Sequence, residues 1–357
     1  MHAEILLSIA MLSALVLYSL LAGADYGAGF LDLTCSGPRK EQQRAAIASA
    51  IQPVWETNHV WLILVVVLMF SGFPAAFSAI GTRLPGLLLL VLLGIVLRGS
   101  SFVFRAYFAG DPQTQLYWGR VFSISSSLTP FFLGIVIGAI SDGSAAANAS
   151  SRGSWFRVAW LDFFPLSVGL LSLSLFAYLA ATYLTVEAPD RKLQDDFRRR
   201  ALISGSVSVF AATLTYLLAG SSAPGIREGL AKSTLSCAAE LGAVLSAFFA
   251  FRSLILRRYR RARVAAAAEV GLIVIGWAGA QFPYLFRPDV TLFNSAAPAN
   301  VVWDLILACG LGGLVLLPSL CLLFRVFKGR RGAGVGLESN LQEDSLQVSG
   351  AEEGERK

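Results

Sequence analysis

The stretch FFPLSVGLLSLSLFAYLAATYLTV, residues 163–186, decides the fold class of this chain. It contains no Asp, Glu, Lys or Arg, so a helix built from it has no charged face to turn toward water. A helix of this length, rising 1.5 Å per residue, is long enough to cross the roughly 30 Å apolar core of a bilayer. The stretch therefore predicts a transmembrane α-helix.

Uncharged stretches of similar length recur along the chain. Six more lie at residues 5–24, 57–82, 121–141, 201–226, 270–286 and 305–324. Two weaker ones lie at residues 84–97 and 233–251, the latter interrupted by Glu240. The composition agrees, because 55% of the 357 residues are hydrophobic and 15% are charged, against about a quarter charged in soluble domains. We expect an all-α, polytopic membrane protein with about nine transmembrane helices.

Basic residues collect in alternate loops between these stretches. One set of loops holds 21 Lys and Arg residues, beginning with Arg39, Lys40 and Arg44 and continuing with Arg98 and Arg105, whereas the other set holds 6. Because positive charge stays on the cytoplasmic side, the N-terminus is predicted outside and the C-terminus inside, which requires an odd number of spans. The net charge of +6 thus reflects membrane orientation and not nucleic-acid binding.

The chain divides by composition into two parts. Residues 1–328 form one predicted transmembrane domain, and residues 329–357, which are Gly-rich and then polar and acidic, are predicted to be a disordered cytoplasmic tail. The four cysteines include no CxxC pair, so they indicate small packing residues and neither a disulfide framework nor a metal site.

Two carboxylates lie near the inner end of the first span, in GADYGAGFLDL (residues 23–33). Asp25 and Asp32 are seven residues apart and therefore share one helical face. Ionisable groups within a bilayer are costly and mark functional sites by default, and a buried carboxyl group suits a proton relay. The alternative is structural: Asp25 pairs with a basic residue and Asp32 lies at the interface.

A second polar cluster, QPVWETNHVWLI (residues 52–63), opens the second span. Glu56 precedes His59 by three residues, so the two side chains can touch, and Asn58 lies beside them. The functional interpretation is a proton entry site built on Glu56. The structural one is an interfacial belt, with Trp55 and Trp61 at headgroup level.

The sequence offers few ligands for redox chemistry. Its histidines are His2 and His59, and its methionines are Met1, Met11 and Met69. Haem needs axial His, Met, Cys or Tyr ligands, so a multi-haem enzyme cannot be ligated by this chain alone. A third polar stretch, QFPYLFRPDVTLFNSAAP (residues 281–298), predicts an ordered outer loop without assignable chemistry.

These motifs together resemble subunit II of the cytochrome bd quinol oxidases. The resemblance rests on GADYGAG (23–29), PVWETNHVWLI (53–63), FPYLFRPDVTLFN (282–294) and Pro318, and it covers nearly all of residues 5–328. It implies two four-helix bundles plus one peripheral helix, in a bacterial plasma membrane. Relatives often carry Pro-His-Trp-Asp where this chain has Pro53-Val54-Trp55-Glu56, and Arg-Pro where it has Arg98-Gly99.

The resemblance also implies a division of labour. Such enzymes oxidise quinol and reduce dioxygen to water, with haem b and haem d held by subunit I. Subunit II supports that partner and contributes an acidic proton pathway, here Glu56, Asp25, His59 and Asn58, while Trp55 and Trp61 serve as quinone-contacting or packing aromatics. Relatives leave open a structural quinone and a small single-span accessory subunit. The rival readings are a purely structural assembly subunit and a solute or ion transporter, whose usual internal repeats are not evident.

Overall fold

The computed structural model describes residues 3–51, 58–107, 112–143, 161–316, 318–319 and 322. The chain divides into two units, Met1–Trp303 and Asp304–Lys357. The predicted tail, residues 329–357, lies outside the described residues. The first unit contains, in chain order, α1 (Ala3–Leu33), α2 (Lys40–Ile51), α4 (Val60–Gly72), α5 (Pro74–Arg83), α6 (Pro85–Tyr107), α7 (Pro112–Asp142), α9 (Phe163–Glu187), α10 (Arg191–Ser222), α11 (Pro224–Lys232), α12 (Thr234–Ile255), α13 (Tyr259–Gln281), β1 (Tyr284–Phe286), β2 (Val290–Thr291) and α14 (Leu292–Ser295).

The all-α polytopic prediction is confirmed. In the described part of the chain, eight helices, including Ala299–Leu316, are long and apolar enough to cross a membrane, and the count reaches nine if α4 and α5 form one span. Both weaker stretches belong to such helices, α6 and α12. The predicted eighth span was too long, because residues 284–286 form strand β1.

The predicted second span is not one straight helix. Helices α4 and α5 meet at Phe73 with a bend of 112°. Pro74 has no backbone N–H to continue the hydrogen-bond ladder, and its ring disfavours helical backbone at the preceding residue. Phe73 accordingly has φ −133° and ψ 60°, and Pro74 starts a new helix, a position where proline costs little.

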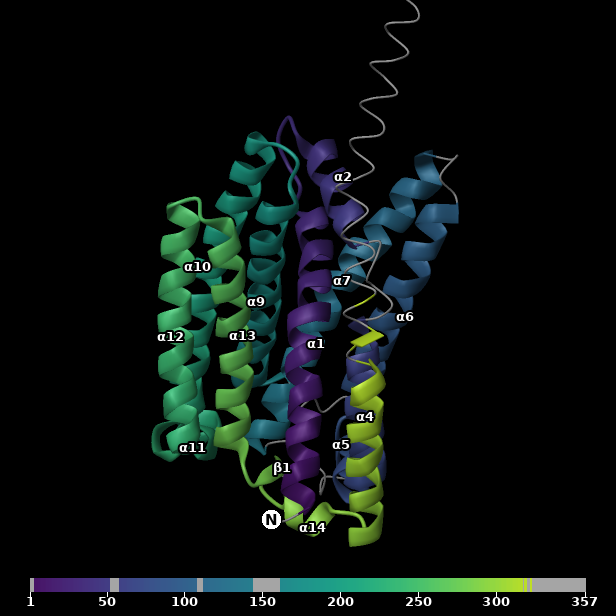
Figure 1. Cartoon of the computed structure of the whole chain (residues 1–357), viewed down its shortest axis with the longest axis vertical. Coiled ribbons are helices and arrows are strands. Elements are labelled where there is room, and N and C mark those ends of the chain that lie inside the picture. Colours follow the sequence, from purple (N-terminus) through teal and green to yellow (C-terminus); the bar gives the residue numbers. More distant parts are fainter. Residues whose placement is uncertain are drawn as a thin grey trace, which may run out of the picture. The chain divides into compact units, whose positions relative to one another are not determined.

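Helix α9 packs against α1, α7, α10 and α13, so it lies among helices from early and late parts of the chain (Figure 1). Glycine makes two of these contacts close. A Cβ at Gly27 of α1 would lie 1.9 Å from the Phe176 carbonyl oxygen, and one at Gly134 of α7 would lie 2.7 Å from the Val168 carbonyl oxygen. Each of these glycines belongs to a GxxxG pair, Gly23–Gly27 or Gly134–Gly138, and both pairs pack within this chain. The division into two four-helix bundles stays a prediction.

The stretch after α13, which the sequence predicts to be an ordered outer loop, forms an antiparallel hairpin. Strand β1 pairs with β2, and Thr291 and Asn294 form a reciprocal capping box at the start of α14. The Arg287 backbone N–H donates to the Ile140 carbonyl oxygen at 3.1 Å, which joins the hairpin to the end of α7. In Figure 1, β1, α11 and α14 lie at the end opposite α2.

Candidate functional site

Asp25 of α1 forms a buried ion pair. Its Oδ2 lies 2.8 Å from Nη2 of Arg98 on α6, and the two side chains are 3% and 2% exposed. An unpaired charge in this position would lose most of its solvation, so each partner is the main compensation for the other. We call Asp25 and Arg98, together with the Ser126 and His59 side chains that hydrogen-bond to Arg98, the inner rung.

Arg98 connects three further side chains to the inner rung. Its Nε donates to Ser126 Oγ on α7 at 3.1 Å, and its guanidinium lies 4.7 Å from the centre of the Tyr26 ring. Its Nη1 lies 3.3 Å from His59 Nε2. Because arginine only donates, we assign Nε2 as the acceptor, which places the histidine proton on Nδ1. That buried Nδ1 has no hydrogen-bond partner among the described residues.

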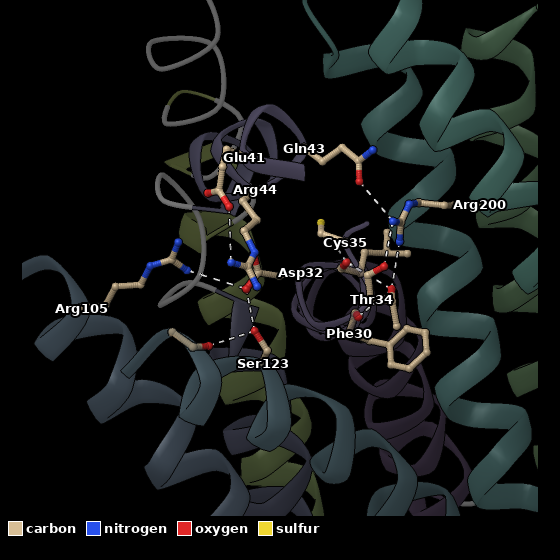
Figure 2. A network of polar contacts seen from close by, with 12 residues as sticks. Phe30, Asp32, Thr34, Cys35, Glu41, Gln43, Arg44, Arg105, Ser123 and Arg200 are labelled. Carbon is tan, nitrogen blue, oxygen red and sulfur yellow. Dashed lines mark hydrogen bonds and ion pairs between the residues drawn. The ribbon is translucent and has the colours of Figure 1, made fainter. Parts of the chain in front are cut away.

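Asp32 forms a second polar group near the end of α1 (Figure 2). Ser123 Oγ of α7 donates to its Oδ2 at 2.6 Å. Arg44 Nε lies 3.7 Å from its Oδ1, and Arg105 Nη1 lies 3.9 Å from its Oδ2. We call Asp32, Ser123, Arg44 and Arg105 the outer rung, since both arginines are about a quarter exposed while Asp32 is buried.

The two rungs draw the same residue types from the same three helices, although Ser126 accepts from Arg98 and Ser123 donates to Asp32. Helix α1 supplies Asp25 and Asp32, α6 supplies Arg98 and Arg105, and α7 supplies Ser126 and Ser123. The aspartates and the arginines are each seven residues apart, so the rungs are separated by about 10 Å along the helices. The arrangement places two buried carboxyl groups in sequence along one helical seam.

The outer rung adjoins a network that joins α1, α2 and α10 (Figure 2). Arg200 donates to Thr34 Oγ1 at 2.9 Å and to Gln43 Oε1 at 3.1 Å, and Gln43 Nε2 donates to Asp196 at 3.0 Å. Beside it, burial raises the pKa of the Cys35 thiol to about 11, so that thiol is protonated at neutral pH. We call this end of the helices, with α2, the start of α10 and the α12–α13 turn, the basic end.

Comparison with known proteins identifies the family. The family described as cytochrome bd terminal oxidase subunit II matches residues 3–327. The chain belongs to this family. It is 25% identical to a putative cytochrome bd menaquinol oxidase subunit II of Bacillus subtilis, over 87% of this chain and 91% of the relative. It is 23% identical to the cytochrome bd-I ubiquinol oxidase subunit 2 of Escherichia coli K12, over 58% of this chain and 53% of the relative.

A solved structure shares the fold. The chain matches a chain of the bd oxidase from Geobacillus thermodenitrificans with a TM-score of 0.78 and 22% identity, over 92% of this chain and 99% of that one. The protein is thus a subunit II of a respiratory cytochrome bd quinol oxidase, and its relatives are subunits of such complexes.

The structure brings together some of the residues predicted for the site of this subunit II. Asp25 and His59 both contact Arg98, and Asn58 is buried and donates to the Leu21 carbonyl oxygen at 3.4 Å. Trp61 is buried on α4 at 7% exposure. Glu56 and Trp55 lie outside the described residues, so their roles stay predictions.

Arg98 itself was missed by sequence reasoning. It was counted among the loop cations, yet it is buried inside α6 and is the largest fully buried side chain in the described structure. The sequence did contain a sign of this position. Helix α6 continues after Arg98 through GSSFVFRAY to Tyr107, which places Arg98 well inside the helix. The weak apolar stretch 84–97 ended at Arg98 only because that residue is charged.

Glu269 is a second residue that the sequence analysis did not single out. It directly precedes the apolar stretch 270–286 and was taken as its boundary, but α13 begins at Tyr259, ten residues earlier. The side chain is buried, at 4% exposure, beside the Tyr178 hydroxyl of α9.

The described residues do not fit a haem. His59 is engaged through Nε2 with Arg98, and its ring lies edge-on to Tyr26 at a centroid distance of 5.8 Å. No group of three His, Cys, Asp or Glu side chains that could hold a metal occurs in the described part of the chain. The site is built from carboxyl, hydroxyl, guanidinium and imidazole groups; carboxyl and imidazole groups can take up and release protons, whereas a guanidinium stays protonated.

Proposed function

We propose that this subunit II conducts protons from the basic end through the outer and inner rungs toward the oxygen-reducing partner, subunit I, and that it supports the fold of that partner. The observation that carries the proposal is the repeated carboxyl–arginine–serine arrangement along α1, α6 and α7. Buried carboxyl groups spaced along one seam are the usual elements of proton relays in membranes.

The order of the relay follows from exposure. Arg44 and Arg105 are partly exposed at the outer rung, and Asp32 lies behind them. Asp25 follows about two turns deeper, where Arg98 links it to His59. The Nδ1–H of His59 has no partner among the described residues and can donate to a water. Glu56, the carboxylate that the sequence favours, lies outside the described residues.

The complex supplies the remaining chemistry. We place haem b and haem d in subunit I, because the described residues here do not fit a haem. Quinol oxidation then belongs to the partner as well. The proposal also includes a structural quinone beside Trp55 or Trp61 and a small single-span accessory subunit. We place the complex in the bacterial plasma membrane.

The test is the turnover of the complex with Glu56→Gln, which keeps size and hydrogen bonding but removes the titratable proton. Quinol-dependent oxygen consumption per haem should fall at least about tenfold, the scale of a lost acid–base group. Glu56→Asp should be milder. The matched control is Glu228→Gln, the same change on an exposed carboxylate of α11 that pairs with Lys232 and lies away from both rungs.

A structural role is the second candidate, and the Asp25–Arg98 pair favours it, because a fully paired carboxylate is a poor proton carrier. A relay role and an assembly role predict different effects of Glu56→Gln on turnover and on haem content. If Glu56→Gln keeps wild-type turnover per haem and lowers only the haem content of the purified complex, the relay fails and the assembly role stands.

A further inference from the structure

Six arginines crowd the turn between α12 and α13, at the basic end and away from both rungs. They are Arg252, Arg257, Arg258, Arg260, Arg261 and Arg263. Two clefts open around this turn. The larger has a volume of about 490 Å³ and the smaller about 220 Å³, and Arg258 and Arg261 line both.

The turn is a defined structure. Helix α12 ends in a Schellman motif, in which the Arg258 N–H donates to the Ser253 carbonyl oxygen at 2.8 Å and the Arg257 N–H donates to the Leu254 carbonyl oxygen at 3.2 Å. Arg257 takes the left-handed position of that motif, with φ 58°. Arg198 of α10 donates to the Leu254 carbonyl oxygen at 2.7 Å, which fixes the turn to its neighbour.

Two of the six arginines form ion pairs with carboxylates of the described residues. Arg257 lies 3.1 Å from Asp195, and Arg263 lies 3.2 Å from Glu187. Among the described residues no carboxylate lies within ion-pair distance of Arg258 or Arg261, and both side chains are exposed. The clefts therefore present guanidinium groups whose charge is available to an anion.

The smaller cleft is half apolar. Phe249, Leu256 and Ala265 line it beside the arginines. Phe249 on α12 and Leu256 at its C-cap are 56% and 49% exposed, and α12 is long and apolar enough to cross a membrane. An occupant of this cleft therefore meets guanidinium groups at one end and a hydrocarbon surface at the other.

We propose that the α12–α13 turn binds the phosphate headgroup of an anionic phospholipid, with Arg258 and Arg261 on the phosphate and the acyl chains along Phe249 and Leu256. Arginine forms forked, charge-assisted hydrogen bonds with phosphate oxygens. Basic pockets between membrane helices on the cytoplasmic side suit such headgroups. A free phosphate ion shares the headgroup chemistry but would leave the apolar wall uncovered.

The experiment uses the purified complex of this subunit with its partner, stripped of lipid and titrated with phosphatidylglycerol or phosphatidylcholine under native mass spectrometry. The variant is Arg258→Gln with Arg261→Gln, which removes the two arginines that both clefts share. Each basic residue contributes on the order of a fivefold change in lipid affinity, so phosphatidylglycerol binding should weaken at least tenfold. Phosphatidylcholine binding should not change.

Two matched variants keep the test specific. Arg191→Gln with Arg199→Gln removes the same charge from exposed residues of α10 outside the clefts, and it should bind like the wild type. Arg258→Lys with Arg261→Lys keeps the charge and should retain most of the binding. Should the double Gln variant fail to assemble with its haems, Arg261→Gln alone should still weaken phosphatidylglycerol binding several-fold.

Four results would overturn the proposal. They are wild-type affinity in the double Gln variant, an equal loss in the α10 control, displacement of the lipid by a millimolar excess of inorganic phosphate, and lipid binding that appears only after deletion of residues 329–357. The third would identify a phosphate-ion site, and the fourth would identify the acidic C-terminal segment as the occupant.

Discussion

Asp25 illustrates how one neighbour changes the chemistry of a carboxyl group in a membrane. The sequence places it on the same helical face as Asp32, and both are buried as that spacing predicts. The sequence left open whether Asp25 carries protons or pairs with a cation, and Arg98 lies 2.8 Å away. In the relay that we propose, proton transfer through this rung has to proceed with the ion pair intact, through His59 or a water beside it, or by transient opening of the pair.

The cost of that pairing is measurable by a double-mutant cycle. Asp25→Asn alone leaves the Arg98 guanidinium buried and uncompensated, and Arg98→Gln alone does the same to Asp25. Each should destabilise the subunit by about 3–5 kcal/mol, seen as earlier loss of haem absorbance on heating. The double variant leaves two neutral amides and should recover most of the loss. Additive losses in the double variant would show that the pair is not coupled.

The residue-scale predictions had a clear physical limit. Periodicity assigns a residue to a helical face, so the position of Asp25 and Asp32 could be predicted. Periodicity cannot say which distant helix faces that side, so neither Arg98 nor Ser126 could be joined to Asp25 in advance. Glu269 was missed for a related reason, because a charged residue beside an apolar stretch was taken to mark the end of the helix.

Among the elements, one kink occurs twice. Phe73 before Pro74 has φ −133° and ψ 60°, and Ala223 before Pro224 has φ −134° and ψ 57°. Each is followed by a short helix, α5 or α11, and then by two long ones, α6 and α7 or α12 and α13. The segments α5–α7 and α11–α13 thus share a structural pattern. The sequence analysis did not find it, since the two segments have little in common in sequence beyond the proline that starts each one.

The hairpin β1–β2 is the element whose pH dependence can be argued. Arg83 of α5 donates to Asp289 Oδ1 and Oδ2 at 2.9 and 2.8 Å, and these hydrogen bonds hold the pKa of Asp289 below its usual range. A lowered carboxyl pKa stabilises the folded state above the unfolded pKa of about 3.9, and this stabilisation is lost as pH falls through the folded value.

We therefore expect amide exchange in residues 284–295, corrected for intrinsic rates, to stay constant from neutral pH to about 5 and to rise below about 4. Asp289→Asn should raise exchange at neutral pH and remove most of the pH dependence. Asp162→Asn, the same change on an exposed residue before α9, should leave the hairpin as in the wild type. Equal exchange in wild type and Asp289→Asn at neutral pH would contradict the role of this pair.

For the molecule as a whole, the open question is which end faces the cytoplasm. The contacts assign the ends relative to one another within the first unit. Arg39 with Asp196 and Arg200 with Thr34 place the end of α1 beside the start of α10, whereas Arg83 with Asp289 places the end of α5 beside the hairpin. Moving Arg98 from the loops into α6 leaves 20 basic residues against 6, so the asymmetry persists.

The basic end is predicted to be cytoplasmic, and one pair of cysteine variants tests this. Lys192 at the start of α10 and Glu228 on α11 are both exposed and lie at opposite ends of the first unit. In a background with the four native cysteines replaced by serine, a membrane-impermeant maleimide should label Glu228→Cys in right-side-out vesicles. Lys192→Cys should react only in inside-out vesicles, because cytoplasmic loops retain positive charge. The reverse labelling would place the basic end, with Asp32 and its partners, on the side of the membrane away from the cytoplasm. The outer rung could then not take protons from the cytoplasm, and the proposed direction of the relay would be wrong.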